Sequence, residues 1–224
     1  MSLHLQKDLD QLKQDILELG SMVETSIDNS LLALAEGRVN LAEIVIEAEE
    51  WINKKEVFIE DCCLKILALH QPVAVDLRFI VVVLKVNNDL ERMGDLAINI
   101  AKQAEFLSGE EPIAWPPEFS NFMFKTVRAM VKSSLDALVK LDVNLAYGVI
   151  AMDDSVDDIH RNMYAEMQVL MKNDAAKVER AVSLISTSRY LERIADMATN
   201  IAEEVIFVVD GVVIRHQDNA SNEL

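Results

Sequence analysis

The sequence predicts an all-α protein made of two pseudo-symmetric three-helix bundles, with six long helices in total. Composition is the first reason: 51% of the 224 residues are hydrophobic, yet the chain has only 6 Gly and 4 Pro, a balance typical of helical bundles. Periodicity is the second, because apolar residues recur at steps of three and four through most of the chain. The third is a motif that occurs twice and divides the chain into two similar halves.

We expect the first half to contain three long helices joined by short turns. From Leu5 onward the apolar side chains keep a helical spacing up to Gly37, a residue type that commonly ends helices, and a second helix runs to the interruption at Pro72. The third helix includes the β-branched stretch FIVVVLKV, which is strand-like but has no second strand nearby to pair with. The helices expected in this half span residues 5–36, 39–69 and 73–107.

A cluster of helix breakers from Gly109 to Pro117 separates the halves, and we expect Trp115 to pack this linker onto a bundle. The second half repeats the plan, with helices expected at residues 118–151, 153–172 and 175–210. The chain therefore divides into a first bundle (1–108), a Pro-rich linker (109–117), a second bundle (118–211) and a polar C-terminal tail (212–224).

The repeated motif reads LERMGDLAINIA at residues 90–101 and LERIADMATNIA at residues 191–202, with eight identical positions at an offset of 101. On a helix, Glu91, Asp95 and Asn99 fall within a sector of roughly 80°, beside an apolar face. One copy alone is most simply interpreted as the solvated face of an amphipathic helix. Surface positions tolerate substitution, however, so the same polar residues in both copies indicate that these carboxylates have a function.

A second match supports the duplication. VNLAEIVIEAEEWIN at residues 39–53 aligns with VNLAYGVIAMDDSVD at residues 143–157, an offset of 104 that pairs Glu49 with Asp153. The fall of the offset from 104 to 101 fits a connection that is three residues shorter in the second half. Each copy of the motif then lies on the third helix of its bundle.

Charge and targeting signals limit the partners and the compartment. The formal net charge is −17, from 38 acidic and 21 basic side chains, which would repel nucleic acid and anionic membrane surfaces. The sequence begins without a signal-peptide pattern, and its longest apolar run, Phe79 to Leu84, is far too short for a membrane span. We expect a cytoplasmic protein with no direct membrane insertion, in which the adjacent Cys62 and Cys63 are buried thiols.

Acidic residues four positions apart predict two metal sites. Such spacing places each pair on one face of its helix, and two packed helices could direct four oxygen-bearing side chains at one point. The ligands we predict are Glu49, Glu91, Asp95, Asp153, Asp157, Glu192 and Asp196. Hard oxygen ligands suit iron, manganese, magnesium or calcium better than structural zinc.

Two questions stay open at these positions. Arg92 and Arg193 could neutralise the acids as ordinary salt bridges, in which case no metal is needed. His160 follows Asp157 by three residues and could face the same ion, whereas the equivalent residue in the first half is Glu56. The sequence leaves the role of His160 undecided.

Catalytic patterns are missing from the sequence. It contains no phosphate-cradling glycine loop, no Ser/His/Asp or Cys/His set and no dinucleotide fingerprint, so we predict no catalytic residues, no organic cofactor and no enzyme activity. The alternative is a carboxylate-bridged di-metal oxidase of the ferritin-like type. Those proteins carry two Glu-xx-His pairs, and here only Asp157 with His160 comes near that pattern.

Both Glu-Arg-x-(Gly/Ala)-Asp copies, the turn segment HQPVAVDLR at residues 70–78 and the duplicated plan resemble the PhoU family of bacterial phosphate-uptake regulators. The resemblance covers about residues 3–210. It implies a homodimer of double bundles that carries iron, or else manganese, magnesium, calcium or zinc, on the acidic pairs. This chain departs from the family pattern at Ala195, where Gly is usual and the helices should approach less closely, and at Asn53, which replaces an acid and should weaken the first site.

The same resemblance implies a function. A PhoU-like protein restrains the ATPase of the phosphate ABC transporter and a phosphate-sensing histidine kinase when phosphate is plentiful. We therefore expect a cytoplasmic metal-binding adapter that damps phosphate uptake and phosphate-starvation signalling. The same adapter without metal, with its acids simply solvated, is a further alternative.

Overall fold

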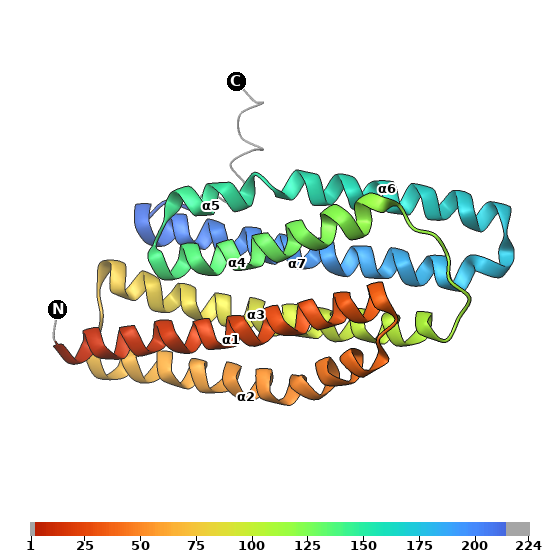
Figure 1. Cartoon of the computed structure of the whole chain (residues 1–224). Helices are drawn as coiled ribbons and strands as arrows, with labels where there is room; N and C mark the ends of the chain where they lie inside the picture. Colours follow the sequence, from red (N-terminus) through yellow and green to blue (C-terminus); the bar gives the residue numbers. More distant parts are fainter. Residues whose placement is uncertain (1–2, 214–224) are drawn as a thin grey trace, which may run out of the picture.

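The computed structural model describes residues 3–213, which form two three-helix layers packed side by side (Figure 1). The helices of the first layer are α1 (Leu3–Glu36), α2 (Val39–His70) and α3 (Ala74–Ser108). The second layer contains the π-helical turn η1 (Phe119–Met123), α4 (Phe124–Lys140), α5 (Val143–Ile150), α6 (Asp153–Asn173), the 3₁₀ turn η2 (Ala175–Lys177) and α7 (Val178–Asp210). No strand occurs within residues 3–213, and the predicted all-α fold of two three-helix bundles is confirmed.

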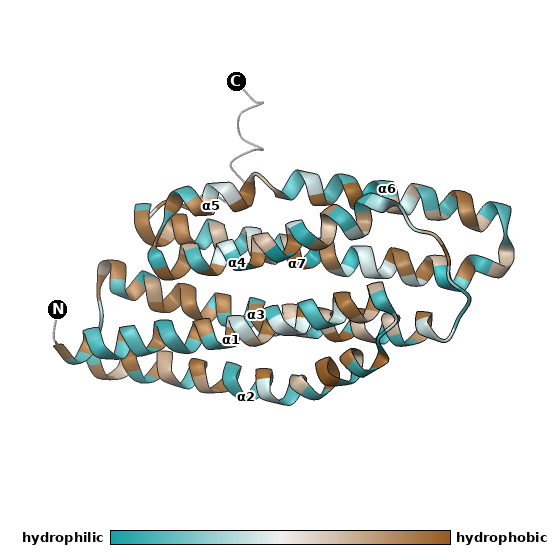
Figure 2. Cartoon of the chain, viewed as in Figure 1, coloured by the Kyte–Doolittle hydropathy of each residue, from teal (hydrophilic) through white to brown (hydrophobic). Residues whose placement is uncertain are grey.

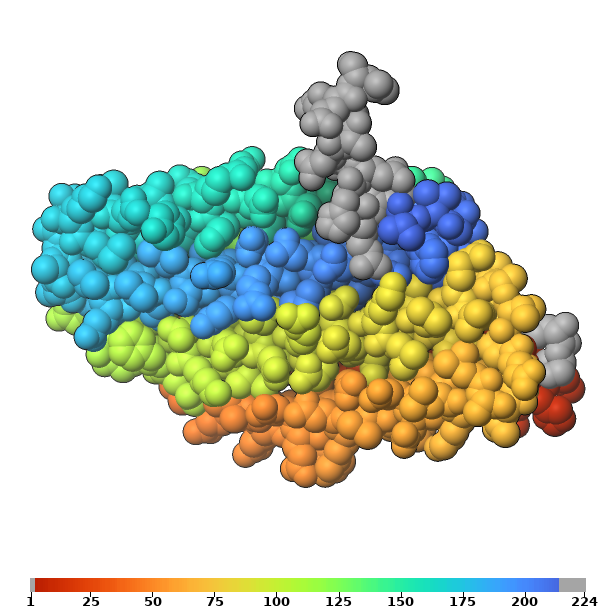
Figure 3. Space-filling model, turned by 180° about the vertical axis from the view of Figure 1, so that it is seen from behind, coloured from red at the N-terminus to blue at the C-terminus, as the bar shows by residue number. Residues whose placement is uncertain are grey.

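Helices α3 and α7 lie side by side at the centre, while α2 and α6 form opposite outer edges (Figure 3). The two central helices run antiparallel, since Lys85 Nζ on α3 lies 3.0 Å from Glu204 Oε1 on α7 and Ser183 Oγ donates to Gln103 Oε1 at 2.7 Å. A single apolar core extends through both layers. Both motif copies fall between these two polar contacts, in the middle of the central helix pair.

The strand-like stretch in the first half is helical, as predicted. Val82 and Val83 have no exposed surface, and packing of such residues against neighbouring helices outweighs their preference for strands. The predicted interruption is also confirmed: α2 ends at His70, the following residue Gln71 has a left-handed φ of 46°, and α3 begins at Ala74.

The second half turns at a different place from the one we predicted. We expected one helix over residues 118–151, but α4 ends at Lys140 and the chain reverses at Leu141, whose φ is 52°. Asp142 then caps α5, because its Oδ1 accepts from the backbone N–H groups of Asn144 and Leu145 at 2.9 and 3.2 Å. Leu141 is the repeat equivalent of Gly37, which has a φ of 65°.

Helices α5 and α6 together are therefore the counterpart of α2, interrupted only by a short break at Ala151 and Met152. The repeated letters VNLA already indicated this turn, because Val39 and Val143 each begin the second helix of their half. The apolar periodicity, by contrast, continues through residue 141 and predicts a single helix there. A non-glycine residue in the left-handed region carries no periodicity signal.

The linker is packed onto the bundles, as predicted from Trp115. Its indole meets the Phe119 ring edge to face, with 6.1 Å between ring centroids. Arg180, only 7% exposed, donates from Nη1 to the carbonyl oxygen of Glu111 at 2.6 Å. Of the polar tail predicted at residues 212–224, all but Val212 and Val213 lie outside the described residues.

At the other end of the molecule, an arginine side chain also hydrogen-bonds across the two halves. Arg78 Nε, near the start of α3, donates to the carbonyl oxygen of Val208 at 3.1 Å, near the end of α7. An arginine near the start of each third helix thus donates to a backbone carbonyl oxygen close to the end of the other third helix, Val208 within α7 and Glu111 just beyond α3. Within residues 3–213, every helix is too short or too polar to cross a membrane.

Candidate functional site

Each half of the fold places carboxylates of its second and third helices close together. We define the first acidic cluster as Glu49, Glu56, Glu91 and Asp95, on α2 and α3. The second acidic cluster consists of Asp153, Asp157, Glu192 and Asp196, on α6 and α7. All seven residues predicted as metal ligands belong to these clusters, and Glu56 is an addition.

In the first acidic cluster, partial burial raises the pKa of Glu91. The negative charges of Asp95, Glu56 and Glu49 raise that pKa further, and Arg92 opposes the shift. Burial likewise raises the pKa of Glu56. The four carboxylates therefore share one region and repel one another.

The second acidic cluster shows stronger mutual repulsion. Partial burial, followed by the charges of Glu192, Asp153 and Asp157, raises the pKa of Asp196 to about 6, against an ordinary value of 3.8. The pKa of Glu192 and that of Asp153 are also raised, in each case first by burial and then by Asp157. Without a compensating cation, this set of acids is poorly satisfied.

One oxygen of this cluster has no hydrogen-bond partner. Oδ1 of Asp153 is buried and makes no hydrogen bond of normal geometry, and neither does Oγ1 of Thr199. The Thr199 hydroxyl nevertheless lies close enough to Asp153 to oppose the rise in its pKa. A buried carboxylate oxygen without a partner is costly, and a bound cation would supply the missing interaction.

The salt-bridge alternative finds little support. Arg92 and Arg193 are exposed, and neither takes part in an ion pair of the described chain. Each lowers the pKa of a neighbouring acid less than burial raises it. The acids of both clusters therefore keep most of their charge uncompensated.

The clusters are not ready-made coordination shells. Across residues 3–213, no three His, Cys, Asp or Glu side chains converge tightly enough to hold one ion. The donor set still fits a hard cation, because it consists of carboxylate oxygens and includes the unpartnered oxygen of Asp153. A bound ion would require these side chains to rotate toward it, and the metal ligands remain a prediction.

Beside each cluster, a polar contact links the second helix to the third at equivalent positions. In the second half, Nδ1 of His160 lies 2.8 Å from Oγ of Ser188, and burial lowers the pKa of His160. In the first half, Nδ2 of Asn87 donates to the carbonyl oxygen of Glu56 at 2.9 Å. His160 is thus bound to the neighbouring helix through one ring nitrogen.

The sequence offered a signal for Glu56 that we did not use. It lies seven residues after Glu49, two helical turns along the same face, and it aligns with His160 of the second half.

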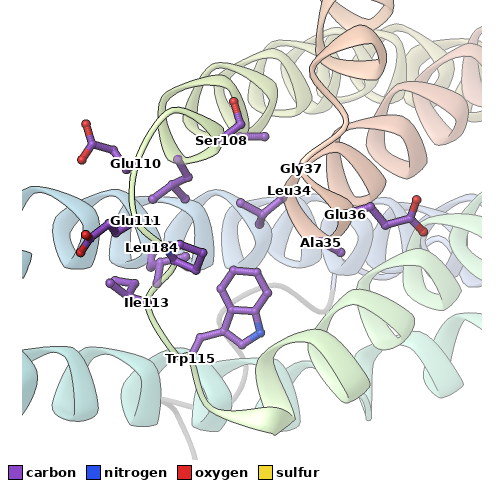
Figure 4. Close-up of a pocket in the computed structure, with 13 residues that line it drawn as sticks. Leu34, Ala35, Glu36, Gly37, Ser108, Glu110, Glu111, Ile113, Trp115 and Leu184 are labelled. Carbon is purple, nitrogen blue, oxygen red and sulfur yellow. The ribbon is translucent and has the colours of Figure 1, made fainter.

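A separate hollow of about 460 Å³ lies between the end of α1 and the linker. Figure 4 shows Trp115, Ile113 and Leu184 around it, with Glu110 and Glu111 on the linker. It contains no member of either acidic cluster, so it is not part of the candidate metal centres.

Comparison with known proteins accounts for this duplicated arrangement. The PhoU domain family model matches the chain twice, at residues 16–104 and 121–205, once in each half. This chain belongs to the PhoU family. The resemblance inferred from the two motif copies is confirmed.

Relatives in the PhoU family match nearly the full chain. A phosphate-specific transport system accessory protein PhoU homolog of Aquifex aeolicus is 38% identical over 211 residues, covering 94% of this chain and 95% of that protein. Its counterpart of the same name in Clostridium acetobutylicum is 36% identical over 207 residues, covering 92% and 94%. These names describe accessory proteins rather than enzymes, in agreement with the predicted lack of catalysis, and they do not favour the ferritin-like oxidase.

Solved PhoU structures share the fold. The crystal structure of PhoU from Pseudomonas aeruginosa superposes with a TM-score of 0.89 at 34% identity, covering 92% of this chain and 99% of that one. The phosphate transport system regulatory protein PhoU from Streptococcus pneumoniae gives a TM-score of 0.87 at 29% identity, with 94% and 99% coverage. The PhoU fold therefore extends over nearly the whole chain.

Proposed function

We propose that this chain is an accessory regulator of a phosphate-specific transport system, acting as a cytoplasmic adapter that catalyses nothing. Support comes from the relatives of that name, which match more than nine-tenths of the chain. The net charge of −17 favours basic protein surfaces as partners. The partners we propose are the ATPase of a phosphate ABC transporter and a phosphate-sensing histidine kinase, both restrained when phosphate is plentiful.

We further propose that each acidic cluster binds metal, with an iron cluster as the first assignment and manganese, magnesium, calcium or zinc as alternatives. One observation carries this part: the two halves keep carboxylates at equivalent places on facing helices, and partial burial together with their mutual repulsion raises the pKa of Asp196 to about 6. A cation would remove the repulsion and hold α2 to α3 and α6 to α7. Its role is therefore to stabilise the docking surfaces rather than to perform chemistry.

Metal analysis of purified protein tests the metal assignment. Protein prepared without chelators should contain metal, and the double variant Asp95→Ala/Asp196→Ala should contain little. The control is Asp61→Ala/Asp158→Ala, which removes two exposed acids outside the clusters and should leave metal content unchanged. Equal metal content in the first double variant and the wild type would reject the assignment, and metal-free wild-type protein would favour the adapter without metal.

The adapter role is tested separately. Transporter ATPase activity in membrane vesicles should fall when this chain is added at high phosphate and recover at low phosphate. Oxygen consumption by ferrous-loaded protein should not exceed that of buffer with iron. Transporter activity that ignores the chain at both phosphate levels would contradict the proposed regulation, whatever the metal content.

A further inference from the structure

The hollow between the end of α1 and the linker has the size and the lining of a ligand-binding site. Its volume of about 460 Å³ falls within the range of small-molecule pockets, roughly 300–1,000 Å³, which form preferentially where domains meet. Both halves of the chain and the linker contribute to it. The largest apolar side chains that line it are Leu34, Leu107, Ile113, Trp115 and Leu184.

Every charged residue that lines the hollow is acidic. Glu36 lies on one side, at the end of α1, while Glu110 and Glu111 lie on the other side, on the linker, with apolar side chains between them (Figure 4). The linker between α3 and α4 changes from a hydrophilic to a hydrophobic stretch along its course (Figure 2). Two negatively charged rims separated by apolar walls complement a molecule with positive ends and a hydrocarbon middle.

Two helices also end at the hollow. The last carbonyl groups of α1 and α3 carry partial negative charge, which favours a cation beside them. Neither helix has a basic residue in its last turn. In the second half, by contrast, the residue equivalent to Glu36 at the offset of 104 is Lys140, in the last turn of α4. The end of α4 thus has its own cation, whereas the ends of α1 and α3 do not.

Two arginines near the hollow compensate this negative charge only in part. Arg38 pairs with Glu36 at 3.4 Å, and both side chains are about half exposed, so water weakens the pair. Arg180 donates from Nη1 to the backbone carbonyl oxygen of Glu111 at 2.6 Å, while the same atom lies 4.0 Å from Oε2 of that residue. Glu110 takes part in none of the ion pairs formed within residues 3–213.

We propose that this hollow binds a linear aliphatic polyamine, with one ammonium group near Glu36 and another near Glu110 and Glu111. The three glutamates are exposed and can rotate toward the bound ammonium groups. The methylene chain lies against Trp115 and Ile113, and an ammonium group over the indole face is attracted to it as well. The bound polyamine connects the end of α1 to the linker and so stabilises the junction between the two halves. This inference depends neither on metal in the acidic clusters nor on the transporter.

Titration of the full chain with spermidine tests the proposal. Because the chain has 2 Trp, the variant Trp51→Phe leaves Trp115 as the only indole, and its fluorescence reports binding at the hollow. Magnesium in excess screens the acidic clusters and the other exposed acids. We expect a saturable change in Trp115 emission and a matching heat of binding by calorimetry. Butylamine, which has one ammonium group, should bind about fivefold more weakly or less, because it loses one exposed charge pair.

Neutral variants separate this site from general attraction to an acidic protein. Glu110→Gln/Glu111→Gln should weaken spermidine binding by about fivefold. The matched control Asp61→Asn/Asp158→Asn removes the same number of negative charges at exposed positions outside the hollow and should leave the affinity unchanged. Equal weakening by both double variants would mean that spermidine is only a counterion, and would overturn the proposal.

A filling variant tests the cavity itself. Ala35→Phe adds a ring to the lining of the hollow without changing any charge and should abolish the response of Trp115. Ala114→Phe, at an exposed linker position outside the lining, should leave the response intact. Unchanged helical content would show that both variants fold. Binding that survives Ala35→Phe, or a wild-type chain that shows no saturation at millimolar spermidine, overturns the proposal as well.

Discussion

A Cβ atom added to Gly94 would lie 3.2 Å from Cδ1 of Ile52 on the facing helix. The equivalent residues of the second half are Ala195 and Val156, both without exposed surface. One half thus has the smaller residue on the third helix and the larger on the second, while the other half has the reverse. The sequence predicts that Ala195 loosens the approach of the helices. The smaller side chain of Val156 leaves room for the methyl group of Ala195, so this loosening is not required.

This relationship predicts a compensating pair of substitutions. Gly94→Ala gains about 1 kcal/mol of helix propensity but crowds a side chain with little room, at about 1–3 kcal/mol, so a net loss of about 1 kcal/mol is expected. Adding Ile52→Val should restore the free energy of unfolding to the wild-type value or above, a coupling of about 0.5–2 kcal/mol. Urea denaturation of the single and double variants measures this coupling energy.

The control for this pair uses Ile59, another fully buried residue of α2, two turns away from Ile52. Gly94→Ala and Ile59→Val should be additive, because distant sites act independently. Additivity of Gly94→Ala with Ile52→Val would show that the two side chains do not share space.

The metal-free protein should become more stable as the pH falls from 7 to 5. The pKa of Asp196 is about 6 when folded and 3.8 as its ordinary value, so the folded state binds a proton more tightly between these values and loses stability as the pH rises through them. Glu192, Asp153 and Asp157 act in the same direction, and Arg193 opposes them. The melting temperature of the protein in the presence of a chelator, measured between pH 7 and pH 5, tests this dependence of stability on pH.

Asp196→Asn should reduce that pH dependence and raise the stability of metal-free protein at pH 7. The gain should not exceed about 1 kcal/mol, because the side chain is partly exposed and solvent screens its charge. Asp61→Asn, at an exposed position outside the clusters, accounts for the general effect of removing one negative charge. An identical pH slope in both variants would be inconsistent with the repulsion described here.

Loss of Arg180 should destabilise the junction between the halves. Its guanidinium donates to the carbonyl oxygens of Glu111 at 2.6 Å and Ala176 at 3.1 Å. Arg180→Ala leaves both oxygens without this partner, and we expect a cost of about 2–4 kcal/mol together with faster proteolysis of the linker. Arg189→Ala, an exposed arginine on the same helix, should change stability by less than about 0.5 kcal/mol.

If the clusters bind metal, they should differ in affinity. Asp157 of the second cluster corresponds to Asn53 of the first, and Glu56 of the first cluster corresponds to His160, so each second helix contributes two acids but at different positions. Asn53→Asp should tighten binding to the first cluster by about tenfold, since cation affinity follows the number of charged ligands, and Asp157→Asn should weaken the second. Calorimetric titration of apo protein with manganese measures both, and two variants that bind like the wild type would exclude these positions as ligands.

The sequence by itself determined the helices, the duplication and the two sets of carboxylates. Apolar spacing reports which face of a helix is buried, and two internal copies supply the comparison that shows which polar residues are retained. For this reason all seven predicted ligands, from Glu49 to Asp196, lie in the two clusters that the structure assembles. The family could be inferred from the same residues.

Tertiary structure alone decided how these helices meet. The hydrogen bonds made by Arg78 and Arg180 join residues far apart in the chain, and no local pattern predicts them. The raised pKa of Asp196 comes from partial burial and from the charges of Glu192, Asp153 and Asp157, and it depends on how α6 lies against α7. Local pattern fixes which face of a helix is apolar, whereas rotation and approach of packed helices arise from contacts summed over the whole core.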